Sequence, residues 1–312
     1  RNSPSWLLLH PVSRTSSAKV APITSTNAIT GYQLSHKSCE HRRSISIVML
    51  NSFQYLSPPC NGVFRHSLRG ELISFLAHLP MPTTPSTELL LEIYKRLLEK
   101  IGHRNWWPVE YDSGKDAGFE ISAGAILVQN TNWNNAKRAL ANLRDAGIWG
   151  YKAVHEANDE DLIEAIRSSG YYNTKTKKLK AFARTLVEEF DGDDANLFAL
   201  ELPELRGRLL RIYGIGEETA DDIILYAAKK PRFVMDTYTR RLVDRLGWKV
   251  GGNKYADYQR LFESKLEPNV DMWGDFHAQL DGHAARVCVK NDPFCAECVL
   301  LDFCPTGRAN TR

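Results

Sequence analysis

Residues 209–228 read LLRIYGIGEETADDIILYAA, and this stretch decides the fold. It predicts one helix that ends at Tyr213, a tight Gly214-Ile215-Gly216 turn, and a second helix that begins at Glu217. Two glycines separated by one residue let the backbone turn sharply and approach a ligand closely. The free N–H groups at the start of the second helix form a site for one phosphate group. An ordinary corner between two helices would produce the same pattern.

A carboxylate follows this turn in PRFVMDTYTRRL (231–242), where Asp236 stands 20 residues after Gly216. Asp236 lies at the start of another predicted helix, and Asp readily caps a helix N-terminus. A carboxylate at such a position can also take part in chemistry, and the two roles are compatible. Asp236 is therefore both a predicted N-cap and a candidate catalytic residue.

Four cysteines lie further along the chain, in RVCVKNDPFCAECVLLDFCP (286–305), with the spacing C-x6-C-x2-C-x5-C. Four thiolates in so short a loop can bind one tetrahedral metal ion or one iron–sulfur cluster. Zinc ribbons usually carry two C-x2-C knuckles, so a single C-x2-C favours a [4Fe-4S] cluster. Disulfides are the alternative, but the chain lacks the small, cysteine-dense character of disulfide-stabilised secreted domains. The predicted ligands are Cys288, Cys295, Cys298 and Cys304.

The composition allows one or two domains with a sizeable core, since 43% of the 312 residues are hydrophobic. No run of 18 apolar residues is present, so no membrane helix is predicted. The net charge of +3 comes from the N-terminal part, because residues 81–312 hold 32 basic and 35 acidic residues. Binding to a nucleic acid would therefore depend on a local basic patch.

Residues 1–80 differ from the rest of the chain, with no Asp, two Glu and fourteen Ser. We expect this segment to be disordered, or to precede a true start at Met81. A Ser- and Arg-rich, acid-poor transit peptide is a further alternative.

From Met81 onward, apolar residues recur at helical spacing and β-branched alternation is nearly absent, which predicts an all-α protein. Asn158 and Thr174 are predicted N-caps. The predicted helices span 86–102, 118–129, 133–146, 159–168, 174–190, 203–213, 217–229, 237–246, 254–266 and 271–287.

The helix–Gly-Ile-Gly–helix, the Val234-Met235-Asp236-Thr237 stretch and the cysteine spacing together resemble the helix–hairpin–helix (HhH-GPD) DNA glycosylases of the endonuclease III type, over about residues 84–308. The resemblance implies two helical domains flanking a DNA-binding groove. The first would be a six-helix domain at 118–229 with the hairpin. The second would combine 81–117 with 230–312 and hold the cluster loop, 288–304.

The same resemblance implies a base excision repair enzyme whose partner is double-stranded DNA containing a damaged base. Asp236 would stabilise the sugar cation that forms as the base leaves, or orient the attacking water. Gly214 and Gly216 would bind a DNA phosphate. We expect a monomer in the cytoplasm, associated with the nucleoid through DNA.

Two departures from the family narrow the activity. Strand-cleaving members carry a lysine two residues after the second hairpin glycine, where this chain has Glu218. A carboxylate forms no imine with the sugar, so the lyase step is expected to be missing. Lys229 and Lys230 lie at the far end of that helix and are poor substitutes. Adenine-excising members place a glutamate where this chain has Ala125.

IGHRNWWPVEYD (101–112) and AILVQNTNW (125–133) resemble the 3-methyladenine DNA glycosylase III type. By that resemblance Trp106, Trp107, Pro108 and Trp133 line the base pocket. An alkylated purine carries a delocalised positive charge, which aromatic faces attract. Plain packing of the tryptophans is the alternative.

The predicted function is a monofunctional glycosylase for alkylated purines. The alternatives are a bifunctional enzyme acting on oxidised pyrimidines and a non-catalytic lesion-binding protein, which would not need Asp236.

The resemblance also implies that Tyr171 wedges into the duplex and that Gln129 fills the space left by the flipped base. A surface tyrosine in a turn is the alternative for Tyr171. Lysines at 175, 177, 178 and 180 follow Tyr171, and Lys175 is predicted to bind DNA, as is Lys290 in the cysteine loop. A solvated helix face is the alternative for the lysine run.

Overall fold

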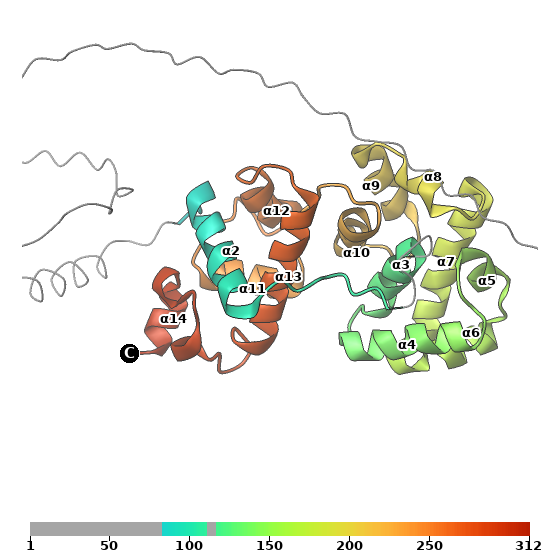
Figure 1. The fold of residues 1–312 in the computed structure, drawn as a ribbon, viewed down its shortest axis with the longest axis horizontal. Coiled ribbons are helices and arrows are strands. Elements are labelled where there is room, and N and C mark those ends of the chain that lie inside the picture. The colour runs from blue at the N-terminus through green and yellow to red at the C-terminus, as the bar shows by residue number, and fades with distance from the viewer. Residues whose placement is uncertain (1–82, 111–116) are drawn as a thin grey trace, which may run out of the picture. The chain divides into compact units, whose positions relative to one another are not determined.

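A computed structural model describes residues 83–110 and 117–312, which belong to one unit of the chain (Figure 1). Every regular element in these two ranges is a helix, which confirms the all-α prediction. Within the same ranges, no helix combines the length and the apolar character that crossing a bilayer requires. The expectations for residues 1–80 lie outside the described residues.

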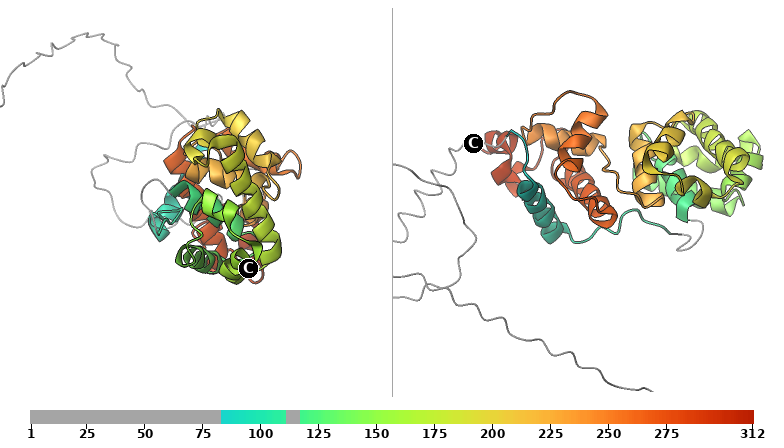
Figure 2. Two further views of the ribbon diagram at one scale, coloured as in Figure 1. Left: turned by 90° about the vertical axis from the view of Figure 1, so that its right-hand side faces the viewer. Right: turned by 90° about the horizontal axis from the view of Figure 1, so that it is seen from above.

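One set of helices joins the start of the described chain to its end (Figures 1 and 2). In this set α13 packs against both α2 and α11, and the Phe262 ring of α12 lies 5.9 Å from the Phe276 ring of α13. The members are α2 (Thr87–Ile101), α11 (Thr237–Arg245), α12 (Tyr255–Glu263), α13 (Val270–Arg286) and α14 (Pro305–Asn310), with the 3₁₀ turns η3 (Cys295–Glu297) and η4 (Leu301–Phe303).

The second set is built around α3, in which residues 119–127 are all buried. A helix that is apolar on every side needs neighbours all around it, and α3 packs against α4, α7, α10 and η2. The members are α3 (Ala117–Leu127), α4 (Trp133–Asp145), α5 (Tyr151–Glu156), α6 (Asp159–Ile166), α7 (Tyr172–Phe190), α8 (Asp194–Phe198), α9 (Leu202–Arg211) and α10 (Glu217–Asp222), with the 3₁₀ turn η1 (Arg167–Ser169) and the π-helical turn η2 (Ile223–Ala227).

The two sets meet where η2 packs against α13. Here the hydroxyl of Tyr226 donates to the carbonyl of Gly274 at 2.9 Å. A Cβ added to Gly274 would lie 3.3 Å from the Tyr226 ring, so the small residue lets the two elements approach. The predicted domain boundaries, 118–229 and 81–117 with 230–312, stay a prediction.

The prediction of six helices in 118–229 is wrong, because it omits α5 and α8. These helices contain only six and five residues. Such short segments show no recognisable 3.6-residue period. The sequence prediction also missed α14, which begins with Pro305 directly after the last cysteine.

The two predicted N-caps had different outcomes. The Asn158 side chain accepts a hydrogen bond from the Asp161 amide at 2.8 Å, which confirms this cap of α6. The prediction for Thr174 is wrong, because α7 already begins at Tyr172. Tyr171 is the capping residue there, with a left-handed backbone (φ 46°) and no side-chain cap bond.

Candidate active site

The Gly214–Gly216 turn joins α9 to α10 as predicted, and its two glycines serve different purposes. Gly214 has φ +84°, and a Cβ there would lie 2.2 Å from the Lys178 side chain, so only glycine fits. Gly216 is the N-cap of α10, and a Cβ there would meet nothing within 4 Å. A side chain at Gly216 would therefore meet no obstacle, in contrast to one at Gly214.

Gln129 lies against this turn. Its amide nitrogen donates to the Gly214 carbonyl at 3.2 Å and to the Thr219 hydroxyl at 2.9 Å. Its amide oxygen accepts from the Lys178 ammonium at 2.5 Å. The structure thus brings together Gln129, Lys178 and the hairpin, which are far apart in the sequence.

Asp236 is the N-cap of α11, as predicted, since its Oδ1 accepts the Thr239 amide at 2.6 Å. The residue is buried, and its Oδ2 lies 3.7 Å from Nε2 of His277 on α13. Burial alone would raise the pKa of Asp236. The ion pair with His277 and the cap bond outweigh burial, so the pKa lies below its usual value of 3.8.

Three further carboxylates surround this pair. Burial and the charge of Asp236 raise the pKa of Glu218 to about 7 and that of Asp281 to about 6. Part of Glu218 is nevertheless open to solvent, so water moderates both the effect of burial and the interaction with Asp236. Burial also raises the pKa of Asp222 well above its usual value. The sequence analysis missed His277, Asp222 and Asp281, and nothing in their spacing relates them to Asp236.

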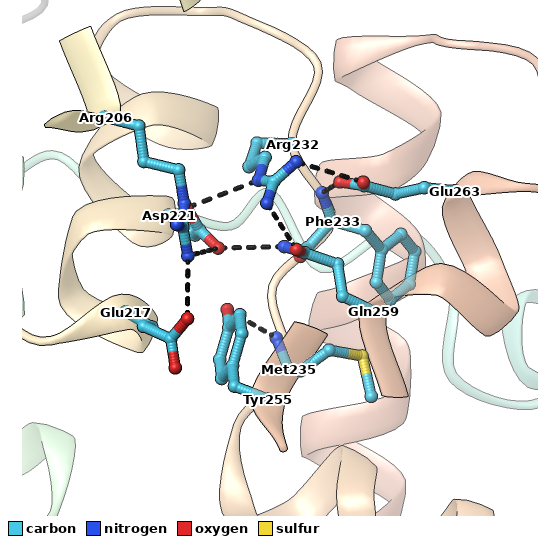
Figure 3. Close-up of polar contacts among 9 residues, drawn as sticks. All are labelled: Arg206, Glu217, Asp221, Arg232, Phe233, Met235, Tyr255, Gln259 and Glu263. Carbon is cyan, nitrogen blue, oxygen red and sulfur yellow. Dashed lines mark hydrogen bonds and ion pairs between the residues drawn. The ribbon is translucent and has the colours of Figure 1, made fainter. Parts of the chain in front are cut away.

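Side chains of α12 hold the segment that leads to Asp236 (Figure 3). Tyr255, Gln259 and Glu263 are four residues apart, so they share one face of the helix. The Met235 amide donates to the Tyr255 hydroxyl at 3.1 Å, and the Phe233 amide donates to Glu263 at 2.9 Å. The Phe233 carbonyl accepts from Gln259 at 2.6 Å. A segment without strand partners thereby satisfies its buried backbone groups.

Asp221 connects this segment to the hairpin helices (Figure 3). Its side chain is fully buried and accepts hydrogen bonds from Arg206 of α9 at 2.7 Å and from Gln259 of α12 at 2.8 Å. The Arg232 guanidinium lies 3.5 Å from the same carboxylate. The hairpin and the segment carrying Asp236 are therefore linked through one buried charged residue.

Three tryptophans from the predicted base pocket come together. The rings of Trp106, Trp107 and Trp133 have centroids 5.2–5.3 Å apart, and Tyr226 lies 5.6 Å from Trp107. Trp107 is buried, and its indole N–H has no hydrogen-bond partner within the described part of the chain. Pro108 is half-buried beside them. This aromatic cluster suits either base stacking or core packing.

Tyr171 is 70% exposed and has a left-handed backbone that L-residues rarely adopt. A strained, exposed aromatic residue favours a functional role over packing. The wedge role of Tyr171 stays a prediction.

The predicted DNA contact of Lys175 is wrong, because its side chain is only 2% exposed. Its ammonium donates to the carbonyls of Leu127 and Ser169 at 2.7 and 2.8 Å, so it fastens α7 to α3. Lys180 likewise donates to backbone carbonyls, whereas Lys177 is exposed. Four lysines close together in sequence thus do not form one patch.

The four cysteines are free thiols that line one cavity. The Arg245 guanidinium donates to the Cys288 sulfur at 3.1 Å, and the Gly307 amide donates to the Cys304 sulfur at 3.2 Å. Burial and the charges of the other cysteines raise the pKa of Cys298 to about 11. Within the described ranges, no three His, Cys, Asp or Glu side chains are arranged to hold a single metal ion. Lys290, in the same loop, is exposed.

Comparison with known proteins gives the family. Residues 123–268 match the HhH-GPD superfamily of base excision DNA repair proteins. The chain is 36% identical over 219 residues to a protein of Methanocaldococcus jannaschii named as a DNA repair glycosylase, covering 70% of this chain and 96% of that protein. The chain belongs to the HhH-GPD superfamily. It is a DNA glycosylase of base excision repair. Endonuclease III of Thermotoga maritima is 29% identical to this glycosylase over 60% of the chain and 82% of the relative.

Two solved structures are similar to the glycosylase. The H. pylori 3-methyladenine DNA glycosylase bound to 1,N6-ethenoadenine has a TM-score of 0.54 and 26% identity, covering 64% of this chain and 98% of that one. An endonuclease III–DNA complex has a TM-score of 0.62 and 18% identity, covering 73% of this chain and 100% of that one. At 18% identity, the second likeness concerns the fold alone.

Proposed function

We propose that this glycosylase is monofunctional and that it excises alkylated purines of the 3-methyladenine kind from double-stranded DNA. The damaged base would be flipped out of the duplex and stacked among Trp106, Trp107 and Trp133. Asp236 would then stabilise the sugar cation left by the departing base, or orient the attacking water.

The aromatic cluster is the observation that carries the choice of substrate. Electron-rich ring faces attract the positive charge of an alkylated purine, and the effect strengthens where water is excluded. Such a base already has a weakened glycosidic bond, so it needs little acid catalysis. The likeness to a 3-methyladenine DNA glycosylase with a bound modified adenine supports this choice.

The absence of a lyase step is proposed from Glu218. This residue occupies the family's lysine position, and its carboxylate interacts with Asp236. A carboxylate cannot attack the sugar to form an imine. The abasic strand would therefore be released uncut.

We assign the hairpin to phosphate binding, through the backbone N–H groups at the start of α10, which follow Gly216. Tyr171 would act as the wedge, since it is exposed at the start of α7 and has a left-handed backbone. Gln129 is held by two hydrogen bonds to the hairpin and one from Lys178 of α7, and it would fill the space left by the flipped base. Lys290 would contribute a phosphate contact from the cysteine loop.

We infer that Cys288, Cys295, Cys298 and Cys304 hold a [4Fe-4S] cluster. The fit rests on four sulfurs around one cavity, with an arginine and a backbone amide donating to two of them. Buried thiols with raised pKa values ionise when a metal binds them. When bound, the cluster supplies a redox-capable centre that cross-links the C-terminal loop.

Mass spectrometry of the bases released from alkylated, oxidised and deaminated DNA tests the proposal. Release of 3-methyladenine with no strand break until alkali is added is the expected result. Release of oxidised pyrimidines with direct strand cleavage would instead indicate a bifunctional, endonuclease III-like enzyme. Binding without release of any base would indicate a lesion-binding protein.

A further inference from the structure

His277 is buried on α13 and lies next to the Asp236 side chain. The two oxygens of the Asp236 carboxylate have different partners. Oδ1 accepts the Thr239 amide at 2.6 Å, and Oδ2 lies 3.7 Å from Nε2 of His277. This distance makes an ion pair rather than a hydrogen bond. Among the residues that the structure describes, Nε2 of His277 has no hydrogen-bond partner.

The other ring nitrogen determines where the protons of His277 lie. Nδ1 is 2.6 Å from the Tyr226 hydroxyl, which itself donates to the Gly274 carbonyl at 2.9 Å. A tyrosine hydroxyl has one proton, so its oxygen must accept a hydrogen bond from Nδ1–H. A neutral ring protonated at Nδ1 would point the lone pair of Nε2 at the Asp236 carboxylate. Only the doubly protonated ring is attracted to it.

The surrounding charges favour the same state. Titratable groups of four elements act on the ring: Asp236 at the start of α11, Glu218 and Asp222 on α10, Tyr226 on η2 and Asp281 on α13. Arg104 acts on Asp281 and so only indirectly on the ring. Burial lowers the pKa of His277, but the carboxylates outweigh burial and raise it to about 9. A positive ring is therefore the stable form near neutral pH.

We propose that His277 is a positioning residue for Asp236, whose protonated ring holds the second carboxylate oxygen and keeps the buried carboxylate negatively charged. The inference rests on the proposed catalytic role of Asp236. A buried carboxylate with three acidic neighbours would otherwise take up a proton as the pH falls. The protonated form could neither stabilise a sugar cation nor accept a proton from water.

The test is the pH profile of single-turnover excision, measured with full-length wild type and His277→Gln on methylated duplex DNA. We expect the wild-type rate to stay level on the acid side down to about pH 5, because Asp236 stays ionised. In His277→Gln the pH below which the rate falls, the acid limb, should move to higher pH by at least about one unit, so the rate loss relative to wild type should grow as the pH falls below about 6. The dissociation constant for DNA should stay within about twofold, since His277 is buried and lies behind Asp236.

Two further variants sharpen the test. Tyr226→Phe removes the acceptor of Nδ1–H and should move the acid limb in the same direction by a smaller amount. The control is His103→Gln, because the His103 side chain is 68% exposed and pairs with Asp275 rather than Asp236. It should leave the acid limb unchanged.

An acid limb in His277→Gln that matches the wild type would overturn the inference. Asp236→Asn separates this failure from failure of the proposed function. If Asp236→Asn still excises bases, the catalytic role of Asp236 fails, and the inference fails with it. If Asp236→Asn is inactive while His277→Gln behaves as wild type at every pH, only the inference fails. Should His277→Gln not fold, ¹⁵N-histidine NMR of the wild type decides, since a neutral His277 ring at pH 7 contradicts the proposal.

Discussion

Asp236 caps α11 through Oδ1 and faces His277 through Oδ2, so one carboxylate serves both helix stability and the charge of the site. Asp236→Asn separates these roles, because Asn is also a good N-cap. We expect excision to fall by roughly 10²–10⁴, since Asn can neither stabilise a cation nor accept a proton. The melting temperatures of wild type and Asp236→Asn should be compared at about pH 9, near the pKa of His277. At this pH the loss of the negative charge opposite His277 costs little stability. If the free energy of unfolding and the excision rate of Asp236→Asn fell to a similar extent, Asp236 would act only as an N-cap.

The ion pair between these residues also makes stability depend on pH. The pKa of His277 is raised from 6.5 in the unfolded chain to about 9 in the folded protein. A raised pKa means that the stabilisation is fully present below about pH 6.5 and is lost as the pH rises through about 9. The difference in Tm between wild type and His277→Gln should therefore shrink from about pH 6 to about pH 9.5. Calorimetry that finds the same difference throughout would contradict the ion pair.

By the family resemblance, Glu218 stands where strand-cleaving members have a lysine, and the proposed absence of strand cleavage rests on this residue. We expect borohydride to trap no covalent protein–DNA adduct, because position 218 holds a carboxylate, which cannot form an imine with the sugar. Glu218→Lys should bring some trapping, although an unfavourable approach to the sugar would limit it. Lys177→Ala, which removes an exposed amine of α7, is a suitable control in the trapping assay. Efficient trapping by the wild type would mean that another amine attacks the sugar.

Among the elements, those with strong local signals could be predicted from the sequence and those without could not. The hairpin and the cap of α11 follow from glycine and aspartate preferences, which are local properties of the backbone. The helices α5 and α8 are too short for periodicity to show. Lys175 illustrates the opposite difficulty, since four nearby lysines suggest one charged face. Only the folded structure shows that α3 and η1 carbonyls bind this ammonium internally.

The α12 face that holds the catalytic segment gives a prediction at the scale of elements. Gln259→Leu would remove one of the donors to Asp221 and the donor to the Phe233 carbonyl, which would leave that buried carbonyl unpaired. Such losses cost about 1–3 kcal/mol of unfolding free energy per group. Arg260→Gln on the same helix is the control, because the Arg260 side chain is 66% exposed and its ion pair with Asp257 contributes little. Similar urea midpoints for both variants would show that the buried network adds no stability.

In the whole molecule, the proposed chemistry depends on elements that the chain brings together from distant positions. Trp107 comes from the segment after α2, Asp236 from the start of α11 and His277 from α13. Each position can be recognised from sequence only where a motif marks it. His277 lies inside a long helix with no motif, and its importance comes from facing Asp236. Pairing between distant side chains is a property of tertiary structure, so the charge balance of the site could not be predicted from one sequence.

The last prediction concerns how the C-terminal loop is held to the rest of the molecule. The loop contains short 3₁₀ turns, and Arg245 of α11 fastens it by donating to the carbonyls of Cys288, Val289 and Lys290. Four free thiols around a cavity would add little cohesion by themselves, whereas a bound cluster would cross-link them. Protein purified without oxygen should therefore contain about four iron atoms per chain. Cys298→Ser should lose the iron and lower the Tm, while Lys177→Ala, at an exposed position of α7 outside the loop, should keep both. Stoichiometric zinc without iron would contradict the cluster, and a Cys298→Ser protein as stable as the wild type would show that the loop is held by Arg245 and its neighbours alone.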